Sequence, residues 1–433
     1  MKQLLQRVLA RLAKKTLRAY KPKVIAITGS VGKTSTRHAI VAAIGSSRRV
    51  RATVENYNNE IGVPLTILNE TSPGRSFFGW VGVLWRGWRC SQGGAHDYPE
   101  ILVLEFGADA RGDIQYLCQM ARPYIAVVTA VGVAHAEYFG TIEDVKEEKS
   151  ALIRGLAADG IAILNADDAN VSGMSHLAKG SVVTYGLGMA DITAEDIRVD
   201  MRQNGETLVG DTMSQLMFTL RMGRDSVPVT MKNVIGDAHV RSVLAGAAVA
   251  LQLGLSPSTI AKNVQSYIPM PGRLRLLPGI KHTLLIDDTY NASPEAVHAA
   301  LEVLCGVPIN AGAQRIAVVG DMLELGRYSE QAHKDVGKHV ATLPIDLFVT
   351  VGEHARDAAR AALEQGMAQT QVYTYANSVD AGRFLQERMK RGDAILVKGS
   401  QGIRTEKIVK ELMAEPLRAP ELLVRQYGKW LAN

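Results

Sequence analysis

The stretch Val24-Ile-Ala-Ile-Thr-Gly-Ser-Val-Gly-Lys-Thr34 places a short apolar run directly before a glycine-rich turn. The apolar run predicts a buried strand, and the residues from Thr34 onward predict a helix. A strand, a glycine turn and a helix N-terminus together present backbone N–H groups and the positive end of the helix dipole to an anion. The stretch therefore predicts an α/β fold whose first loop binds the phosphates of a nucleoside triphosphate.

The residues of this loop have separate expected roles. Gly29 and Gly32 permit the tight turn and let the backbone approach the ligand closely. The ammonium group of Lys33 is expected to reach the terminal phosphates, and the hydroxyl of Thr34 is expected to bind Mg²⁺. The residues predicted to contact the nucleotide here are Gly29, Ser30, Val31, Gly32, Lys33, Thr34 and Ser35.

The composition of the 433-residue chain is that of a soluble globular protein, with 47% apolar and 21% charged residues. Residues 1–23 carry eight basic side chains and no acidic one. Removing these charges from the net charge of +6 leaves the rest of the chain slightly acidic, so we expect no nucleic-acid partner. Three widely spaced cysteines indicate a reducing compartment, and no apolar run reaches the ~18 residues that span a bilayer. We therefore expect a cytoplasmic protein.

Three regions are predicted along the chain. Residues 1–22 form a basic amphipathic helix, and residues 23–267 form a central P-loop domain around a doubly wound, mostly parallel sheet. Residues 268–433 form a second, Rossmann-like α/β domain after a linker rich in Pro and Gly. Residues 182–232 carry alternating strands and turn signals, which predicts a small antiparallel addition to the central domain. The buried strands that we expect are 24–28, 101–106, 125–129, 161–165, 284–287, 316–319, 347–351 and 394–397.

Two segments each allow two interpretations. The helix 1–22 either packs on its own protein or attaches to an anionic membrane surface or a partner. Residues 75–98 hold three of the four tryptophans together with phenylalanines and arginines. They form either a satellite core under a loop or a contact with a membrane interface or lipid substrate. A peripheral contact with the inner face of a membrane is therefore one open alternative.

Two polar residues follow predicted buried strands. Glu105 lies at the end of the strand 101–106, and His135 follows the strand 125–129. Ligands of doubly wound sheets bind at this edge, where a carboxylate suits Mg²⁺. Taken alone, Glu105 is equally a solvated strand-end charge, and a single His is more often structural than a ligand. Lys149, on a predicted helix, by itself pairs with neighbouring glutamates.

The shortened spacing of the loop glycines, with two residues between them, resembles the Mur ligase family, which joins amino acids or peptides to a carboxylate. Motifs of the second α/β domain resemble the same family and follow in family order. They are Pro271-Gly-Arg273, Asp287-Asp-Thr-Tyr-Asn291, Gly320-Asp-Met-Leu-Glu324 and Leu396-Val-Lys-Gly-Ser400. The resemblance is strongest to the branch of the family that adds D-alanyl-D-alanine.

The resemblance implies a set of site residues. Two Mg²⁺ ions are expected, one at Thr34 and the other at Glu105, His135 and a carbamylated Lys149. These residues and Lys33 would be catalytic. Nucleotide contacts across an interdomain cleft are expected from His239, Arg273, Asp287, Tyr290 and Asn291. His239 stands in a motif where the family has Asn, so its contact with the base is expected to differ. The residues expected to contact the substrate are Asn58, Asn59, Glu60, Lys398 and Ser400.

The implied reaction is ATP-dependent amide formation through an acyl phosphate, on a muropeptide or related carboxylate of peptidoglycan metabolism. Members of the family carry an N-terminal domain that holds the UDP end of the substrate, whereas residues 1–22 are too few for one. We therefore expect either a second subunit or a substrate without UDP. Two alternatives stay open: a ligase like folylpolyglutamate synthetase, and a nucleotide-binding subunit of a two-chain enzyme.

Overall fold

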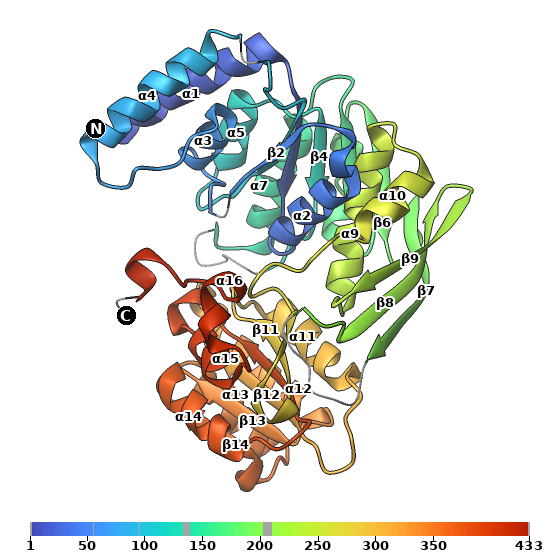
Figure 1. The fold of residues 1–433 in the computed structure, drawn as a ribbon, viewed down its shortest axis with the longest axis vertical. Helices are drawn as coiled ribbons and strands as arrows, with labels where there is room; N and C mark the ends of the chain where they lie inside the picture. Colours follow the sequence, from blue (N-terminus) through green and yellow to red (C-terminus); the bar gives the residue numbers. More distant parts are fainter. Residues whose placement is uncertain (1, 55, 95, 133–138, 202–209, 432–433) are drawn as a thin grey trace. The chain divides into compact units, whose positions relative to one another are not determined.

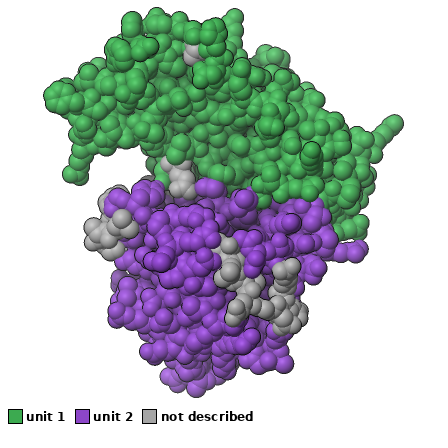
Figure 2. All heavy atoms as spheres, viewed as in Figure 1, with its two compact units in different colours: residues 1–196, 218–229, 240–267 green, residues 197–217, 230–239, 268–433 purple. Residues whose placement is uncertain are grey.

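The computed structural model describes residues 2–54, 56–94, 96–132, 139–201 and 210–431. The chain divides into two compact units, which Figure 2 shows in different colours. Unit 1 comprises Met1–Asp196, Phe218–Val229 and Val240–Tyr267, and unit 2 comprises Ile197–Met217, Thr230–His239 and Ile268–Asn433. Within the described part of the chain, we find no helix with the length and apolar character needed to cross a bilayer.

A nine-stranded sheet begins with the strand that precedes the glycine loop. Its strand order is β2-β3-β1-β4-β5-β6-β7-β8-β9. Pairing is parallel at every step from β2 to β7, which confirms the doubly wound, mostly parallel fold. The strands are β1 (Lys23–Thr28), β2 (Val50–Ala52), β3 (Ile101–Glu105), β4 (Ile125–Val128), β5 (Ile161–Asn165), β6 (Ser181–Gly186), β7 (Ile192–Met201), β8 (Ser214–Met222) and β9 (Asp225–Lys232).

Helices pack on both faces of this sheet (Figure 1). Val24 and Ala26 contribute to a core shared with α1, α3, α5 and α7. The alternate residues Ile25 and Ile27 point to the other face because side chains alternate along a strand. The helices are α1 (Lys2–Tyr20), α2 (Lys33–Ile44), α3 (Gly62–Leu68), α4 (Phe77–Ser91), α5 (Asp113–Met120), α7 (Ile142–Arg154), α8 (Ala169–Ser172), α9 (Asp237–Gln252) and α10 (Pro257–Val264).

The N-terminal helix packs on its own unit. Leu9 of α1 lies in an apolar cluster with Leu65 and Leu68 of α3 and with Val83 of α4. The predicted helix is therefore confirmed, with its apolar side buried inside unit 1. The satellite core expected for the aromatic segment 75–98 is present, because Val83 belongs to the cluster of Leu9, but a helix rather than a loop covers it. This helix, α4, begins after Ser76, whose hydroxyl accepts a hydrogen bond from the N–H of Gly79.

The expected antiparallel addition at 182–232 is wrong for its first two strands. β6 pairs in parallel with β5, and β7 pairs in parallel with β6 through Tyr185↔Ile192 and Gly186↔Thr193. These strands therefore extend the central sheet. Alternation of apolar and polar residues reports a half-exposed strand but carries no information about the direction of its neighbour.

Unit 2 contains a second sheet, of order β10-β11-β15-β12-β13-β14. Only β10 is antiparallel to its neighbour, so the Rossmann-like arrangement is confirmed. The short strands β10 and β14 were not predicted. The elements are β10 (Arg275–Pro278), β11 (Leu284–Asp288), α11 (Pro294–Gly306), β12 (Arg315–Gly320), α12 (Ser329–Thr342), β13 (Leu347–Val351), α13 (Ala355–Glu364), β14 (Val372–Tyr375), α14 (Ser378–Arg388), β15 (Ala394–Lys398), α15 (Glu406–Leu412) and α16 (Ala419–Leu422).

Two helical glycines of unit 2 sit in different surroundings. A Cβ atom at Gly337 in α12 would lie 2.0 Å from the carbonyl oxygen of Ala358 in α13, so the two helices meet backbone to backbone there. A Cβ atom at Gly382 in α14 would lie 3.4 Å from the side chain of Glu411, which is ordinary contact. Of these two glycines, packing therefore requires Gly337 but not Gly382.

We predict that Gly337→Ala lowers the free energy of unfolding by about 1–3 kcal/mol, because the added methyl group must push backbone apart. Gly382→Ala, the matched control, is expected to raise it by about 0.5–1 kcal/mol through helix propensity. Denaturant unfolding of both variants measures the difference. Equal stability of the two variants would contradict the close approach of α12 and α13.

Candidate functional site

The glycine loop lies where the strand order of the central sheet reverses. β1 pairs with β3 on one side and with β4 on the other, although the chain visits β2 before β3. Loops that follow the strands on either side of such a point diverge and leave room for a ligand. The register sets Ile27 opposite Glu105, and Thr28 opposite Val128. Three strand ends therefore meet at the loop.

Gly29 is required by its surroundings. Its φ of 151° is unfavourable for other residues, and a Cβ atom there would lie 2.0 Å from Oγ1 of Thr129. The hydroxyl of Thr129 donates a hydrogen bond of 2.5 Å to the carbonyl oxygen of Val31. Gly32, with φ 86°, precedes the first residue of α2. The end of β4 thus holds the loop in an open turn before a helix N-terminus.

Lys33 folds back over this loop. Its ammonium group donates hydrogen bonds of 2.6 Å to the carbonyl oxygen of Gly29 and 3.4 Å to that of Ser30. The hydroxyl of Ser30 in turn contacts the backbone of Gly132. The charge of Lys33 therefore lies where the phosphates of a bound nucleotide would need neutralising.

Thr34 and Glu105 are in direct contact. The Thr34 hydroxyl donates to Oε1 of Glu105 over 3.0 Å, and Nη1 of Arg37 lies 3.7 Å from Oε2 of the same carboxylate. All three side chains are buried. A hydroxyl beside a carboxylate is a pair of hard oxygen donors that fits Mg²⁺. Among the described residues there is no group of three or more His, Cys, Asp or Glu side chains arranged around a metal.

Lys149 is almost fully buried on α7, with 2% of its surface exposed. Its ammonium nitrogen lies 5.8 Å from the centre of the Phe139 ring. Burial and, to a smaller extent, the charge of Lys33 together lower the pKa of Lys149 to about 7, against the opposing influence of Glu148, Asp109 and Asp113. A large share of this amine is therefore neutral at physiological pH.

Glu148, the neighbour of Lys149, stabilises the start of α5. The carboxylate of Glu148 accepts hydrogen bonds of 2.7 Å from the N–H groups of Gly112 and Ile114, at the start of α5. It does not form the ion pair with Lys149 that the helix pattern suggested as an alternative. His135, the other expected metal ligand, lies outside the described residues.

The three candidate substrate residues before α3 differ in their contacts. The side chain of Asn58 lies against Gly107, just after β3, where a Cβ atom would be 2.9 Å away. Oδ1 of Asn59 accepts from the N–H groups of Ile61 and Gly62, so this side chain holds the turn that leads into α3. Glu60 accepts a hydrogen bond from Gln6 of α1. Of the three, Asn58 lies closest to the strand end that carries Glu105.

In unit 2, two buried aspartates hold the turn that precedes β10. Oδ2 of Asp287 accepts from the N–H of Gly272, and burial raises the pKa of this carboxyl to about 6. Asp288 accepts from the N–H of Leu274 and from the ammonium group of Lys398, 2.6 Å away. Lys398 also donates to the carbonyl oxygen of Asn291. The expected nucleotide and substrate residues of unit 2 are thus joined in one network.

Arg273 and Tyr290 form the second part of this network. The Arg273 guanidinium lies 3.9 Å from the centre of the Tyr290 ring, and its Nε is buried without a hydrogen-bond partner among the described residues. His239 is buried, and its Nε2 lies 3.0 Å from the carbonyl oxygen of Arg273. Burial lowers the pKa of His239 to about 4, so the ring is neutral. In this structure, His239 holds the backbone of Arg273 in place.

Sequence reasoning missed one residue of this network. Arg425, close to the C-terminus, donates to the carbonyl oxygens of Thr289 and Tyr290 and pairs with the buried Glu406. Burial lowers the pKa of Arg425. No local motif marks Arg425, because it is far apart in sequence from the loop that it supports. The hydroxyl of Ser400 accepts from the N–H of Leu323 and so joins two further motif loops.

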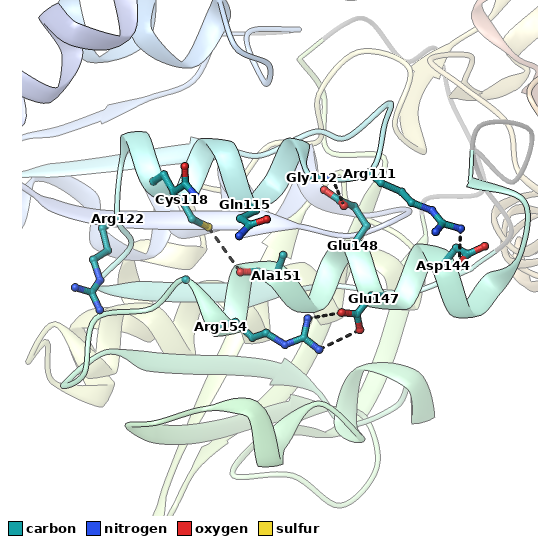
Figure 3. A pocket seen from close by; sticks show the side chains of 12 residues that line it. Arg111, Gly112, Gln115, Cys118, Arg122, Asp144, Glu147, Glu148, Ala151 and Arg154 are labelled. Atoms are coloured by element: carbon teal, nitrogen blue, oxygen red, sulfur yellow. Dashed lines mark hydrogen bonds and ion pairs between the residues drawn. The ribbon is translucent and has the colours of Figure 1, made fainter.

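A groove of about 800 Å³ lies between α5 and α7 (Figure 3). Its arginines are held by neighbours: Arg111 pairs with Asp144, and Arg154 pairs with Glu147. None of the residues expected to bind ATP or substrate lines it. We assign no ligand to this groove.

Comparison with known proteins agrees with these observations. The family model described as the Mur ligase middle domain matches residues 27–78 and 89–250, and the model described as the Mur ligase, glutamate ligase domain matches residues 272–401. The chain is 30% identical over 410 residues to UDP-N-acetylmuramoyl-tripeptide--D-alanyl-D-alanine ligase of Bacillus subtilis, covering 94% of this chain and 80% of that protein.

Solved structures give the same result. The MurF ligase of Thermotoga maritima in complex with ADP matches with a TM-score of 0.75 and 26% identity, over 94% of this chain and 83% of that one. MurF from Acinetobacter baumannii matches with a TM-score of 0.76 and 28% identity, over 93% and 79%. The family resemblance of the loop and of the later motifs is therefore confirmed. Both family models and a relative matched over most of its length agree that this chain belongs to the Mur ligase family.

Proposed function

We propose that this chain joins D-alanyl-D-alanine, or a closely related dipeptide, to a carboxylate of a muropeptide in an ATP-dependent reaction of peptidoglycan synthesis. The observation that carries the proposal is the grouping of Lys33, Thr34 and Glu105 at the ends of β1 and β3, with the buried Lys149 near enough for the charge of Lys33 to lower its pKa. This grouping offers cations, backbone N–H groups and hard oxygen donors to a triphosphate. The identity of the dipeptide comes from the relatives, which are UDP-N-acetylmuramoyl-tripeptide--D-alanyl-D-alanine ligases.

The chemistry divides into two steps. A substrate carboxylate attacks the γ-phosphorus of ATP, which forms an acyl phosphate and releases ADP. The amine of the dipeptide then attacks the acyl carbon, and inorganic phosphate leaves as the amide forms. In both steps the ammonium group of Lys33 and the loop N–H groups stabilise the negative charge on the phosphoryl oxygens.

We further propose that Thr34 holds one Mg²⁺ ion and that Glu105, with His135 and a carbamylated Lys149, holds a second. Magnesium bound there would neutralise the phosphate charge. The neutral amine of Lys149 adds to carbon dioxide, forms a carbamate and releases one proton. The product is an anion at a position where Lys33 disfavours a cation, and the lowered pKa of Lys149 supplies the neutral amine that the reaction needs.

Unit 2 is proposed to bind the nucleoside part of ATP. The partnerless Nε of Arg273 and the ring of Tyr290 offer a hydrogen-bond donor and an aromatic surface. Asp287 and His239 act by holding the turn that carries Arg273. Asn291, Lys398 and Ser400 are candidates for contact with nucleotide or substrate through the same network.

The reaction itself is the first test. We predict that ATP, D-alanyl-D-alanine and a muropeptide together give phosphate release and a product heavier by one dipeptide, detected by mass spectrometry. A panel of UDP-linked, lipid-linked and free muropeptides identifies the carboxylate substrate. Turnover only with folate and glutamate would replace the proposal by the folate alternative, and ATP binding without turnover on any acceptor would favour a nucleotide-binding subunit.

The second prediction concerns Lys149. Removing carbon dioxide from buffer and enzyme should lower activity, and bicarbonate should restore it. More bicarbonate should be needed as the pH falls through about 7, because the protonated amine cannot add to carbon dioxide. Lys149→Ala should lower kcat by about 100-fold or more, with partial rescue by acetate or formate. Lys146→Ala, on the same helix, is the matched control; rates independent of bicarbonate would exclude the carbamate.

The third prediction concerns Glu105. Glu105→Gln keeps the size of the side chain but removes its charge, so the Mg²⁺ concentration for half-maximal activity should rise about 10- to 100-fold. The exposed Glu100 lies just before the same strand, and Glu100→Gln should leave the Mg²⁺ dependence unchanged. Titration of phosphate release with Mg²⁺ measures both. An unaltered Mg²⁺ requirement in Glu105→Gln would remove this residue from the metal site.

A further inference from the structure

The outer face of α4 has an unusual composition for a helix of a soluble unit. Its exposed apolar side chains are Phe77, Phe78, Val81, Trp85 and Trp88, each more than half exposed. At 100° per residue they fall within one arc of the helix. The other exposed side chains of α4 are Arg86 and Arg89. No acidic and no uncharged polar side chain interrupts this face.

The inner face of the same helix explains why α4 is anchored. Val83 and Gly87 are buried, and a Cβ atom at Gly87 would lie 3.1 Å from Leu68 of α3. Trp80 packs against the apolar cluster of Leu9, and its indole N–H donates to the carbonyl oxygen of Gly74. α4 therefore uses Trp80, Val83 and Gly87 for packing within its own unit and leaves its other aromatic residues exposed.

The neighbouring helix α1 adds a basic face. Figure 1 shows α1 and α4 side by side, and Lys15 of α1 donates a hydrogen bond of 2.9 Å to Gln92, directly after α4. The exposed basic side chains of α1 are Arg7, Arg11, Lys14, Lys15 and Arg18. The basic face of α1 and the aromatic face of α4 therefore adjoin, and we call them together the α1/α4 face.

The positive charge of the α1/α4 face indicates which kind of partner it binds. Residues 1–23 and 71–96 contain no Asp or Glu. The carboxylate of the nearby Glu70 forms an ion pair with Arg86, with N–O distances of 2.7 and 2.8 Å. The guanidinium of Arg89 lies 4.9 Å from the centre of the Trp85 ring, so cation and aromatic ring are presented together. Tryptophan, phenylalanine and arginine favour the boundary between lipid head groups and acyl chains, and a cluster of Lys and Arg is attracted to anionic lipids.

We propose that the α1/α4 face docks on an anionic lipid bilayer, with the α4 aromatic side chains inserted among the acyl chains and the α1 basic side chains at the head groups. This is a peripheral contact, in which helices lie on the membrane surface. Such a contact requires an exposed apolar patch beside cations, and the exposed apolar side chains of α4 and the basic side chains of α1 provide both. The contact is separate from the ligase chemistry, because none of its residues belongs to the proposed ATP site.

Flotation of the full-length chain with lipid vesicles tests the proposal. Vesicles of phosphatidylglycerol and phosphatidylcholine should carry the protein, vesicles of phosphatidylcholine alone should carry much less, and salt should weaken the binding. The double variant Phe78→Ser/Trp85→Ser should reduce the bound fraction about tenfold or more, since it removes two of the five exposed apolar side chains of the contact.

Matched controls separate the face from general hydrophobicity and charge. Met189→Ser/Leu417→Ser removes two exposed apolar side chains elsewhere and should leave vesicle binding unchanged. Arg7→Gln/Arg11→Gln/Lys14→Gln should weaken binding to anionic vesicles, whereas Arg356→Gln/Arg383→Gln/Arg391→Gln should not. All of these side chains are exposed, so thermal unfolding should show intact folding for every variant.

Two outcomes would overturn the proposal. One is the absence of binding to anionic vesicles by the wild-type chain. The other is self-association or protein binding that Phe78→Ser/Trp85→Ser abolishes while vesicle binding persists, which would assign the face to a protein partner.

Discussion

The parallel register of β1 between β3 and β4 is the constraint on which the rest of the site depends. It places Ile27 beside Glu105 and Thr28 beside Val128. A shift of one residue would move Glu105 to the opposite face of the sheet, because successive side chains alternate. It would also remove Thr129 from Gly29, where contact distance already excludes any side chain. The loop, the metal donors and the strand that holds them are therefore set by one pairing.

Much of this arrangement could be predicted from local sequence. Long buried strands such as Ile161–Asn165 and Leu347–Val351 are continuous apolar runs, and their bounds agree with the predicted ones. The loop is marked by glycines that its turn requires. What local sequence cannot report is the partner across the sheet, and the direction of β6 and β7 was missed for that reason. The neighbour of a strand is chosen by tertiary packing.

The helix α4 shows a second limit of sequence reasoning. Gly79, Gly82 and Gly87 lower its helix propensity, so the segment resembles an aromatic loop. In the structure two of these glycines make room for neighbours, namely Pro73 at Gly79 and Leu68 at Gly87. Tertiary contact thus overrides weak propensity. Arg425 was also missed because its contacts are tertiary: those with Thr289 and Tyr290 join residues more than a hundred positions apart.

The placement of Lys149 is unfavourable for a positively charged side chain. The positive charge of Lys33 disfavours a positive charge on Lys149, and the burial of Lys149 removes the water that would screen it. The lowered pKa of Lys149 relieves that repulsion by releasing a proton, and a neutral buried amine is a nucleophile. A triphosphate brings several negative charges, which one cation and a helix N-terminus stabilise in part. A Lys149 that becomes an anion would remove the repulsion and add an oxygen donor for Mg²⁺. The unfavourable placement of this lysine is thus consistent with a group that acts in a chemically altered form.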